Sequence, residues 1–240
     1  MFSDLVGSTK LSTRLDPEEM ADTLRSFSNA VCGETARFGG HVARVLGDGV
    51  LAYFGWPVVH EDAAEQAVRA GLAVRTAVAA LRAPDEARLA ARVGIATGLV
   101  MVGEVICEGV AREEAVAGET PNLAARLQAM ASPGRVVVAE GTRRLLGDRF
   151  EIADLGSRRL KGFANPVRAW QIVGEGRARD RFEARRTTGL SPLVGRTHEL
   201  SLLLDRWVLA RGGEGQAILL SGEPGIGKSR LVESLRSGNP

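Results

Sequence analysis

Apolar residues recur at the spacing of an amphipathic helix in two separate stretches of the chain. In the first stretch they are Met20, Leu24, Phe27 and Val31. Asp16 and Pro17 come just before them, as an N-cap and the first residue of a helix would. The sequence therefore predicts a helix over about 16–38 and a second from about 60 to 81. A third helix, from about 120 to 130, is predicted by Thr120 and Pro121 as its N-cap and first residue.

Short apolar runs bounded by turn residues predict strands. The runs 41–46 and 50–54 flank Gly47-Asp48-Gly49, a hairpin signal that places Asp48 at the tip of the turn. Further strands are predicted at 91–98, 100–106, 135–139, 150–152, 158–161 and 167–173, with a short helix at 140–146. The order β-α-β-β-α-β, with additions, favours an α+β fold with helices on one face of a largely antiparallel sheet.

The composition changes after this region. Residues 174–192 are rich in Gly, Arg, Asp and Glu, which is typical of a linker. We therefore predict a first domain over 1–173, a linker over 174–192 and a second unit over 193–240. In that unit the pattern predicts a helix at 200–209 and a strand at 216–220.

A phosphate-binding motif follows the predicted strand at 216–220. Its defining residues are Gly222, Gly227, Lys228 and Ser229, in the spacing of a Walker A loop. Backbone N–H groups of such a loop cradle phosphates, and its Lys and Ser address the terminal phosphate and Mg²⁺. Eleven residues follow Ser229, too few for a second strand with an acidic metal ligand. We therefore expect the start of a longer ATPase module, without hydrolysis by this segment alone.

Composition narrows the choice of partners and compartment. Thirty-one Lys and Arg residues oppose 29 Asp and Glu, with the signs mixed along the chain, so charge favours no nucleic-acid partner. No apolar stretch is long enough to span a membrane and no signal peptide is recognisable, which predicts a cytoplasmic protein without membrane contact. Cys32 and Cys107 lie far apart without other sulfur ligands nearby, so a thiolate metal site is not expected.

Two carboxylates stand where adjacent strands could bring them together. Asp4 follows a very short extended start, and Asp48 lies at the predicted hairpin tip. Such a pair can hold two Mg²⁺ or Mn²⁺ ions, an arrangement suited to phosphoryl or nucleotidyl transfer. Each residue taken alone is equally compatible with an ordinary solvated turn residue.

Five segments in a fixed order resemble the catalytic domain of class III adenylate and guanylate cyclases. They are 2–9, 40–55, 92–98, 118–127 and 160–163. The resemblance covers about residues 1–173 and implies the ferredoxin-like βαββαβ fold of that family. The segment from Leu193 to Ser229 is similar to the start of the AAA/STAND-type ATPase domains that bacterial regulators fuse to a cyclase domain.

The resemblance implies roles for individual residues. The metal ligands would be Asp4, Asp48 and the carbonyl of Leu5. The groups that bind the triphosphate would be the N–H groups of Gly7, Ser8 and Thr9, and the side chains of Arg92 and Lys161. Asn122 would orient the ribose, and Arg126, four residues later on the same helix face, would stabilise charge at the α-phosphate.

The positions that select the base depart from the family pattern. Arg44 stands where the family usually has Lys, and Ala115 stands where it usually has Asp, Thr or Ser. Arg44 can donate to a purine nitrogen, whereas Ala115 offers no side-chain acceptor. The choice between ATP and GTP therefore stays open at this point.

The implied reaction is attack of the ATP 3′-hydroxyl on its own α-phosphorus, giving 3′,5′-cyclic AMP and pyrophosphate. The resemblance also implies a head-to-tail homodimer, in which two copies build two composite sites. Two alternatives remain: a guanylate cyclase, or a cyclase-like module that dimerises and regulates the attached ATPase without turnover.

Overall fold

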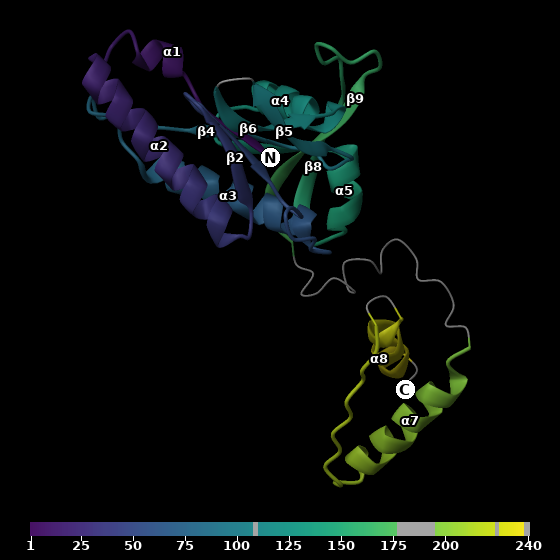
Figure 1. Ribbon diagram of the computed structural model, residues 1–240. Coiled ribbons are helices and arrows are strands. Elements are labelled where there is room, and N and C mark those ends of the chain that lie inside the picture. The colour runs from purple at the N-terminus through teal and green to yellow at the C-terminus, as the bar shows by residue number, and fades with distance from the viewer. Residues whose placement is uncertain (108–109, 177–194, 224–225, 238–240) are drawn as a thin grey trace. The chain divides into compact units, whose positions relative to one another are not determined.

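The computed structural model describes residues 1–107, 110–176, 195–223 and 226–237 (Figure 1). The chain divides into two compact units, Met1–Arg177 and Ala178–Pro240. The predicted linker lies mostly outside the described residues. At its start the prediction is wrong, because Gly174 and Glu175 belong to the last strand of the first unit.

A seven-stranded sheet forms the centre of the first unit. Its strand order is β2 (His41–Leu46), β3 (Gly49–Tyr53), β1 (Phe2–Leu5), β4 (Ala91–Ile95), β7 (Arg135–Ala139), β9 (Val167–Glu175) and β8 (Phe150–Arg158). Neighbours are antiparallel except β4 and β7, which are parallel. The predicted α+β fold with a largely antiparallel sheet is confirmed, and β2 and β3 form the predicted hairpin.

Two strand predictions need correction. A separate two-stranded sheet pairs β5 (Met101–Cys107) with β6 (Val110–Ala117), and β6 was not predicted. Three successive charged residues, 112–114, hide its strand character in the sequence. The predicted strand at 158–161 does not form: β8 runs continuously to Arg158, and a turn follows.

The helices of the first unit are α1 (Ser8–Leu11), α2 (Pro17–Arg37), α3 (Ala63–Ala80), α4 (Glu119–Met130) and α5 (Glu140–Leu146). The predicted N-cap of α2 is confirmed: Asp16 accepts a hydrogen bond from the N–H of Glu19, whose side chain accepts one from the N–H of Asp16. The α4 helix begins at Glu119, one residue before the predicted cap Thr120, whose hydroxyl instead donates to the Leu99 carbonyl at 3.1 Å.

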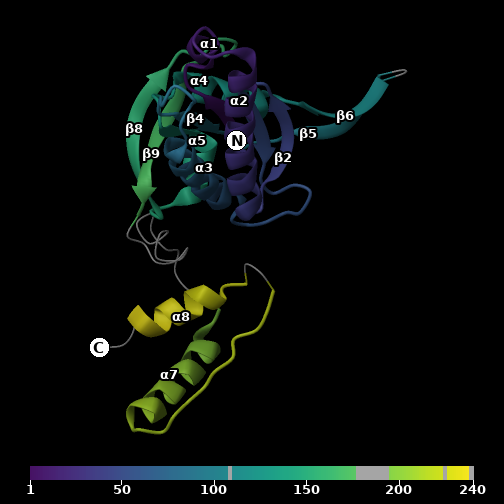
Figure 2. The same cartoon turned by 90° about the vertical axis from the view of Figure 1, so that its left-hand side faces the viewer.

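Helices cover both faces of the sheet, so the prediction of helices on one face is wrong (Figures 1 and 2). On β4, Val93 and Ile95 contact Gly71 of α3. Gly94 lies between them and faces α4, because successive residues of a strand point to opposite faces. A Cβ built on Gly94 would lie 2.1 Å from the carbonyl oxygen of Ala124. The backbones of α4 and β4 are therefore in direct contact.

The apolar core is divided unequally between these two faces. The larger cluster includes Phe27 of α2, Val74 of α3 and Ile95 of β4, together with most of the buried Val and Ala residues of the unit. The smaller cluster lies beside α4 and consists of Leu127, Ala131, Val137, Ala139 and Ala169. The α2 and α3 face therefore supplies most of the apolar burial that stabilises the unit.

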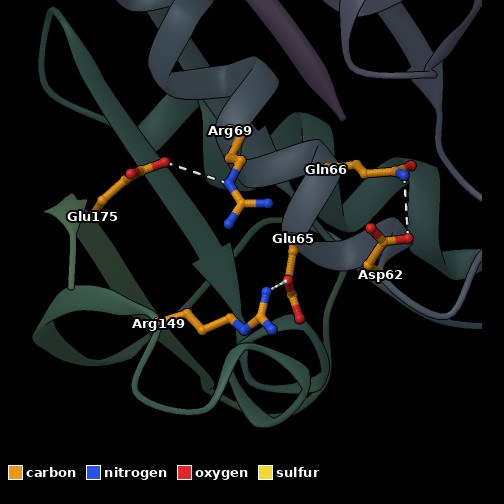
Figure 3. A network of polar contacts seen from close by, with 6 residues as sticks. All are labelled: Asp62, Glu65, Gln66, Arg69, Arg149 and Glu175. Atoms are coloured by element: carbon orange, nitrogen blue, oxygen red, sulfur yellow. Dashed lines mark hydrogen bonds and ion pairs between the residues drawn. The ribbon is translucent and has the colours of Figure 1, made fainter. Parts of the chain in front are cut away.

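A group of polar contacts joins α3 to the ends of β8 and β9 (Figure 3). The carboxylate of Glu65, 2% exposed, pairs with the guanidinium of Arg149, which is 16% exposed. Beside it, Nε of Arg69 donates to Oε1 of Glu175 at 3.3 Å. The buried pair satisfies the charge of Glu65, which would be costly to bury alone.

The second unit contains α7 (Thr197–Arg211) and α8 (Lys228–Ser237), which pack together with Leu203 and Leu231 buried. The predicted helix at 200–209 lies within α7. The predicted strand at 216–220 does not form. A strand needs a neighbour for its backbone hydrogen bonds, and no strand is present among the described residues of this unit.

Candidate active site

The structure brings Asp4, on β1, close to Asp48, in the turn that leads into the neighbouring strand β3. Strand β1 lies between β3 and β4, so that Asp4 is opposite Gly49, the first residue of β3, on one side and Arg92 on the other. The N–H of Leu5 donates to the carbonyl of Asp48 at 2.9 Å. Asp48 occupies the turn between β2 and β3, as the sequence predicted for the hairpin tip.

The two carboxylates are close enough to repel each other. The pKa of Asp4 is raised above its usual value, first by burial and then by the negative charge of Asp48. A hydrogen bond from Gln128 and the positive charge of Arg92 oppose this rise. Partly buried carboxylates in such an arrangement gain from a cation placed between them.

Arg92 presents a further unsatisfied group beside Asp4. Its Nε is buried and has no hydrogen-bond partner among the described residues. A buried guanidinium donor without a partner is suited to an anionic oxygen supplied from outside the chain. The position fits the phosphate-binding role that the resemblance implies for Arg92.

A short turn leads from β1 into α1 next to the carboxylates. Gly7 has φ +72°, a left-handed conformation that glycine adopts without strain. Ser8 and Thr9 open α1, where backbone N–H groups have no acceptor within the helix. The hydroxyl of Ser8 donates a short hydrogen bond to the Asp48 carboxylate. Sequence reasoning assigned only the backbone of Ser8 and missed this contact of its side chain.

Gln128 is a second contact that the sequence did not reveal. Its Nε2 donates to Oδ2 of Asp4 at 2.9 Å, from the buried side of α4. The two residues are 124 positions apart, so no local spacing links them. The sequence offers no signal for this contact beyond the place of Gln128 in the predicted helix, two positions after Arg126.

The implied catalytic pair lies on the solvent side of α4. Asn122 and Arg126 are both exposed, and Nδ2 of Asn122 donates to the carbonyl of Gly118 at 3.4 Å. Arg126 and Gln128 project from nearly opposite sides of the helix, about 200° apart around its axis. The structure therefore does not aim Arg126 at the Asp4 of the same chain.

The remaining implied residues are spread over other elements. Lys161 is exposed in the turn after β8, and Arg44 is exposed on the edge strand β2. Ala115 lies on β6, paired with Gly103 of β5. They come from separate elements, so a site that used all of them would be assembled from distant parts of the fold.

The donors around Asp4 fit a divalent cation of the Mg²⁺ type. Among the described residues there is no group of three or more His, Cys, Asp or Glu side chains that could hold a metal. Two carboxylates and a backbone carbonyl, such as that of Leu5, match the sparse protein ligation of Mg²⁺, which completes its shell with water and substrate phosphates. The oxygen-only set also accepts Mn²⁺.

An apolar cavity of about 220 Å³ opens between the ends of β3 and β4 and the first turn of α4. Its lining includes Tyr53, Trp56, Ile95, Thr97 and Pro121. Neither Asp4 nor Asp48 lines it. The cavity is therefore separate from the carboxylate pair.

In the second unit, the Walker A residues surround the start of α8. The helix begins at Lys228, followed by Ser229, and Gly227 immediately precedes it. Nζ of Lys228 donates to the carbonyls of Gly222 at 2.8 Å and Glu223 at 2.9 Å. The ammonium group thus points back to the loop, in the region where the motif predicts phosphate.

Comparisons with known proteins match the two parts of the chain to two different families. Residues 1–174 match the adenylate and guanylate cyclase catalytic domain family, and residues 192–238 match the AAA ATPase domain family. An uncharacterised protein of Rhizobium meliloti is 38% identical over 97% of the chain and 22% of its own length. Adenylate cyclase 1 of the same organism is 30% identical over 77% of the chain and 28% of its own length. The chain thus spans about a quarter of these two relatives.

Solved structures show the same fold. The adenylyl cyclase CyaB of P. aeruginosa is 29% identical with a TM-score of 0.66, covering 73% of this chain and 93% of that one. The guanylyl cyclase Cya2 is 28% identical with a TM-score of 0.69, covering 75% of this chain and 92% of that one. No helix among the described residues is long and apolar enough to cross a membrane. The fold, the paired carboxylates and the family matches together show that the chain belongs to the adenylate and guanylate cyclase catalytic domain family, with an AAA ATPase segment after it.

Proposed function

We propose that the first unit is a class III adenylate cyclase that converts ATP to 3′,5′-cyclic AMP and pyrophosphate. The observation that carries this proposal is the position of Asp4 on β1 beside Asp48 in the turn before β3, with the unpartnered Nε of Arg92 next to Asp4. The site joins a place for cations to a donor for phosphate. That combination suits attack of a hydroxyl on a nucleotide phosphate.

The carboxylates of Asp4 and Asp48, with the Leu5 carbonyl, would hold two Mg²⁺ or Mn²⁺ ions. Such ions, when bound, lower the pKa of the ATP 3′-hydroxyl and neutralise charge on the phosphates. The chain contributes the orientation of the two carboxylates through the register of β1 and β3. No covalent intermediate with a protein side chain is needed.

The remaining groups would hold and stabilise the nucleotide. Arg92 and Lys161 would contact the phosphates, and the backbone N–H groups at the start of α1 would add donors to the triphosphate. Asn122 would orient the ribose, which fixes the hydroxyl in line with the α-phosphorus. Arg126 would stabilise the charge that develops at that phosphate.

The orientation of α4 supports a head-to-tail homodimer. Asn122 and Arg126 are exposed, whereas Gln128 on the other side of α4 reaches the Asp4 of its own chain. A second copy would therefore receive Asn122 and Arg126 at its carboxylate pair, giving two composite sites. Exposed apolar residues at the end of β2 and around the start of β5 offer contact area for such a partner: Val45, Leu46, Leu99, Val100 and Met101.

ATP is the substrate that we propose. The similarity to Adenylate cyclase 1 and to the adenylyl cyclase CyaB supports this choice. Arg44 would donate to a ring nitrogen, and because Ala115 has no side-chain acceptor, contacts to the adenine amino group would come from backbone or water. The P-loop of the second unit would bind a nucleotide of its own through Lys228 and Ser229.

Product analysis tests the reaction and the base together. The purified chain is incubated with ATP or GTP and Mn²⁺, and products are identified by mass spectrometry. We expect cyclic AMP from ATP, and none from the Asp48→Asn variant of equal melting temperature. Cyclic GMP as the main product would show that the chain is a guanylate cyclase and not an adenylate cyclase. If a folded dimer made no cyclic nucleotide, the first unit would be assigned as a regulatory module and not as an enzyme.

Mixing two inactive variants tests the composite site. Asp48→Asn damages the carboxylate side, and Asn122→Ala damages the helix side. In mixed dimers one site combines both intact sides, so we expect activity to return after subunit exchange. A matched mixture of Asp48→Asn with Asp4→Asn serves as the control, since neither chain then brings an intact carboxylate side. Exchange demonstrated without recovery would contradict the head-to-tail arrangement.

A further inference from the structure

The side chain of Gln128 is buried, which is unusual for a glutamine. It is 6% exposed, on the side of α4 that faces the sheet. Its Nε2 donates to Oδ2 of Asp4 at 2.9 Å, and among the described residues it is the only side chain hydrogen-bonded to that carboxylate. Burying an amide lowers the stability of the fold unless its polar atoms form hydrogen bonds.

The backbone under Gln128 is held in place by close packing. A Cβ on Gly94 would lie 2.3 Å from the backbone nitrogen of Gln128 and 2.9 Å from its Cα. Gly94 lies two residues beyond Arg92, which is opposite Asp4 in the sheet. The contact between α4 and β4 therefore fixes the point from which Gln128 reaches the carboxylate.

The hydrogen bond constrains how Asp4 presents its oxygens. A carboxylate on a single Cβ can rotate about its terminal torsion, which is broad for Asp. Donation from Gln128 to Oδ2 ties one oxygen to α4, and thereby sets the direction in which the other oxygen points. Groups that orient a metal ligand in this way typically change metal affinity 10- to 100-fold when removed.

We propose that Gln128 is a positioning residue that holds the Asp4 carboxylate ready to bind a divalent cation. This inference rests on the proposed function for the presence of that cation at Asp4. Gln128 does not touch substrate or metal in this proposal; it acts through Asp4. No local pattern in the sequence points to it, since its partner is distant in the chain.

Manganese binding tests this role without relying on turnover. The full chain is titrated with Mn²⁺ in the absence of nucleotide, and free Mn²⁺ is followed by electron paramagnetic resonance. The binding lost in Asp4→Asn defines the site. In Gln128→Met, which keeps the volume but removes the donor, we expect the dissociation constant of that site to rise at least about tenfold. Gln128→Asn, whose amide is one methylene shorter, is expected to weaken binding as well.

A matched control is available on α3. Nε2 of Gln66 donates to Oδ1 of Asp62 at 3.1 Å, an amide-to-carboxylate bond of the same kind away from the site (Figure 3). Gln66→Met should leave Mn²⁺ binding unchanged. If the chain turns over ATP, raising Mn²⁺ should restore the rate of Gln128→Met, because only the affinity for the cation is reduced.

Two results would overturn the proposal in distinguishable ways. Mn²⁺ affinity in folded Gln128→Met and Gln128→Asn within twofold of the unchanged chain, with binding lost in Asp4→Asn, would remove Gln128 from the site while leaving the proposed function intact. If instead the unchanged chain showed no Asp4-dependent binding of Mn²⁺, the metal site itself would fail, and the role of Gln128 with it.

Discussion

The two faces of the central sheet divide the work of the cyclase unit. On one face, α2 and α3 bury the larger apolar cluster, and the Glu65–Arg149 pair ties α3 to the region before β8. On the other face, α4 buries a small cluster and leaves polar groups around Asp4 only partly satisfied. Stability is thus concentrated where no chemistry is proposed, and the candidate site lies where the packing is lighter. Sites that hold like charges together need such support from elsewhere in the fold.

The largest expected effect is on activity alone. Arg126 is exposed and contributes little to packing, so Arg126→Ala should leave the melting temperature unchanged. Loss of its charge at the α-phosphate should lower kcat/KM about 100- to 1,000-fold, equivalent to about 3 to 4 kcal/mol. Initial rates and thermal unfolding measure the two quantities. Arg144→Ala on α5, also exposed, should change neither, and a rate that survives Arg126→Ala would exclude Arg126 from catalysis.

The next largest effect is a loss of stability where α4 contacts the sheet. Gly94→Ala places a methyl group 2.1 Å from backbone oxygen of α4, so helix and strand must move apart. We expect a loss of about 3 kcal/mol in the free energy of unfolding, the upper end for overpacking. Gly33→Ala in α2 is the control, since a Cβ there meets nothing within 4 Å. It should stabilise by about 0.5 to 1 kcal/mol in urea unfolding. Equal effects of both variants would contradict the close contact.

A smaller loss should come from the α3 face without direct damage to the site. Arg149→Met removes the guanidinium that pairs with the buried carboxylate of Glu65 (Figure 3). Because Arg149 keeps some access to water, we expect about 2 kcal/mol, below the cost of breaking a fully buried pair. The double variant Glu65→Leu/Arg149→Met should lose less than the single one. Arg25→Met, which breaks an exposed pair with Asp22, should cost less than about 1 kcal/mol.

The smallest effect concerns how stability depends on pH, and its sign is opposite to that of a carboxylate stabilised by a cationic partner. The pKa of Asp4 is raised in the folded chain above its unfolded value of 3.8. The folded state then binds more protons in the window above pH 3.8, and stability falls as pH rises through it. Asp4→Asn lacks this penalty, so at pH 7 without divalent cations it should melt slightly higher than the unchanged chain.

The difference between the two chains should vanish as the pH falls below 3.8, where Asp4 is protonated in both states. Added Mn²⁺ should raise the melting temperature of the unchanged chain and leave Asp4→Asn unaffected, because only a state that binds the ion gains stability from it. A lower melting temperature for Asp4→Asn at pH 7 would show that the ionised Asp4 carboxylate does not destabilise the folded chain.

Local signals were sufficient for the parts of the fold that local chemistry determines. The N-cap of α2 and the hairpin that carries Asp48 were predictable because turn and cap residues act within a few positions. The α+β order followed from the same runs. The pairing of Asp4 with Asp48 was predicted as a possibility, and the register of β1 and β3 realises it.

Features that depend on distant partners were not predictable in the same way. The segment 216–220 has no neighbouring strand among the described residues of its unit, so its apolar character alone does not form a sheet. Nothing in the sequence distinguishes Gly94 from other strand glycines, although its lack of a Cβ allows α4 to approach β4 closely. Gln128 acquires its partner only through that contact. Burial pattern could be anticipated from the helical period, but the identity of the opposing residue could not.

The contact at Gly94 has a mechanical consequence. Where α4 crosses Gly94, no side chain separates the two backbones, so this contact cannot be compressed or repacked, and we expect helix and strand to move together. Asn122 and Arg126 then keep a fixed distance from the Asp4 of their own chain. In a head-to-tail dimer, opening and closing around the nucleotide would have to come from rotation of one whole subunit against the other, with α4 acting as a stiff lever between the two sites.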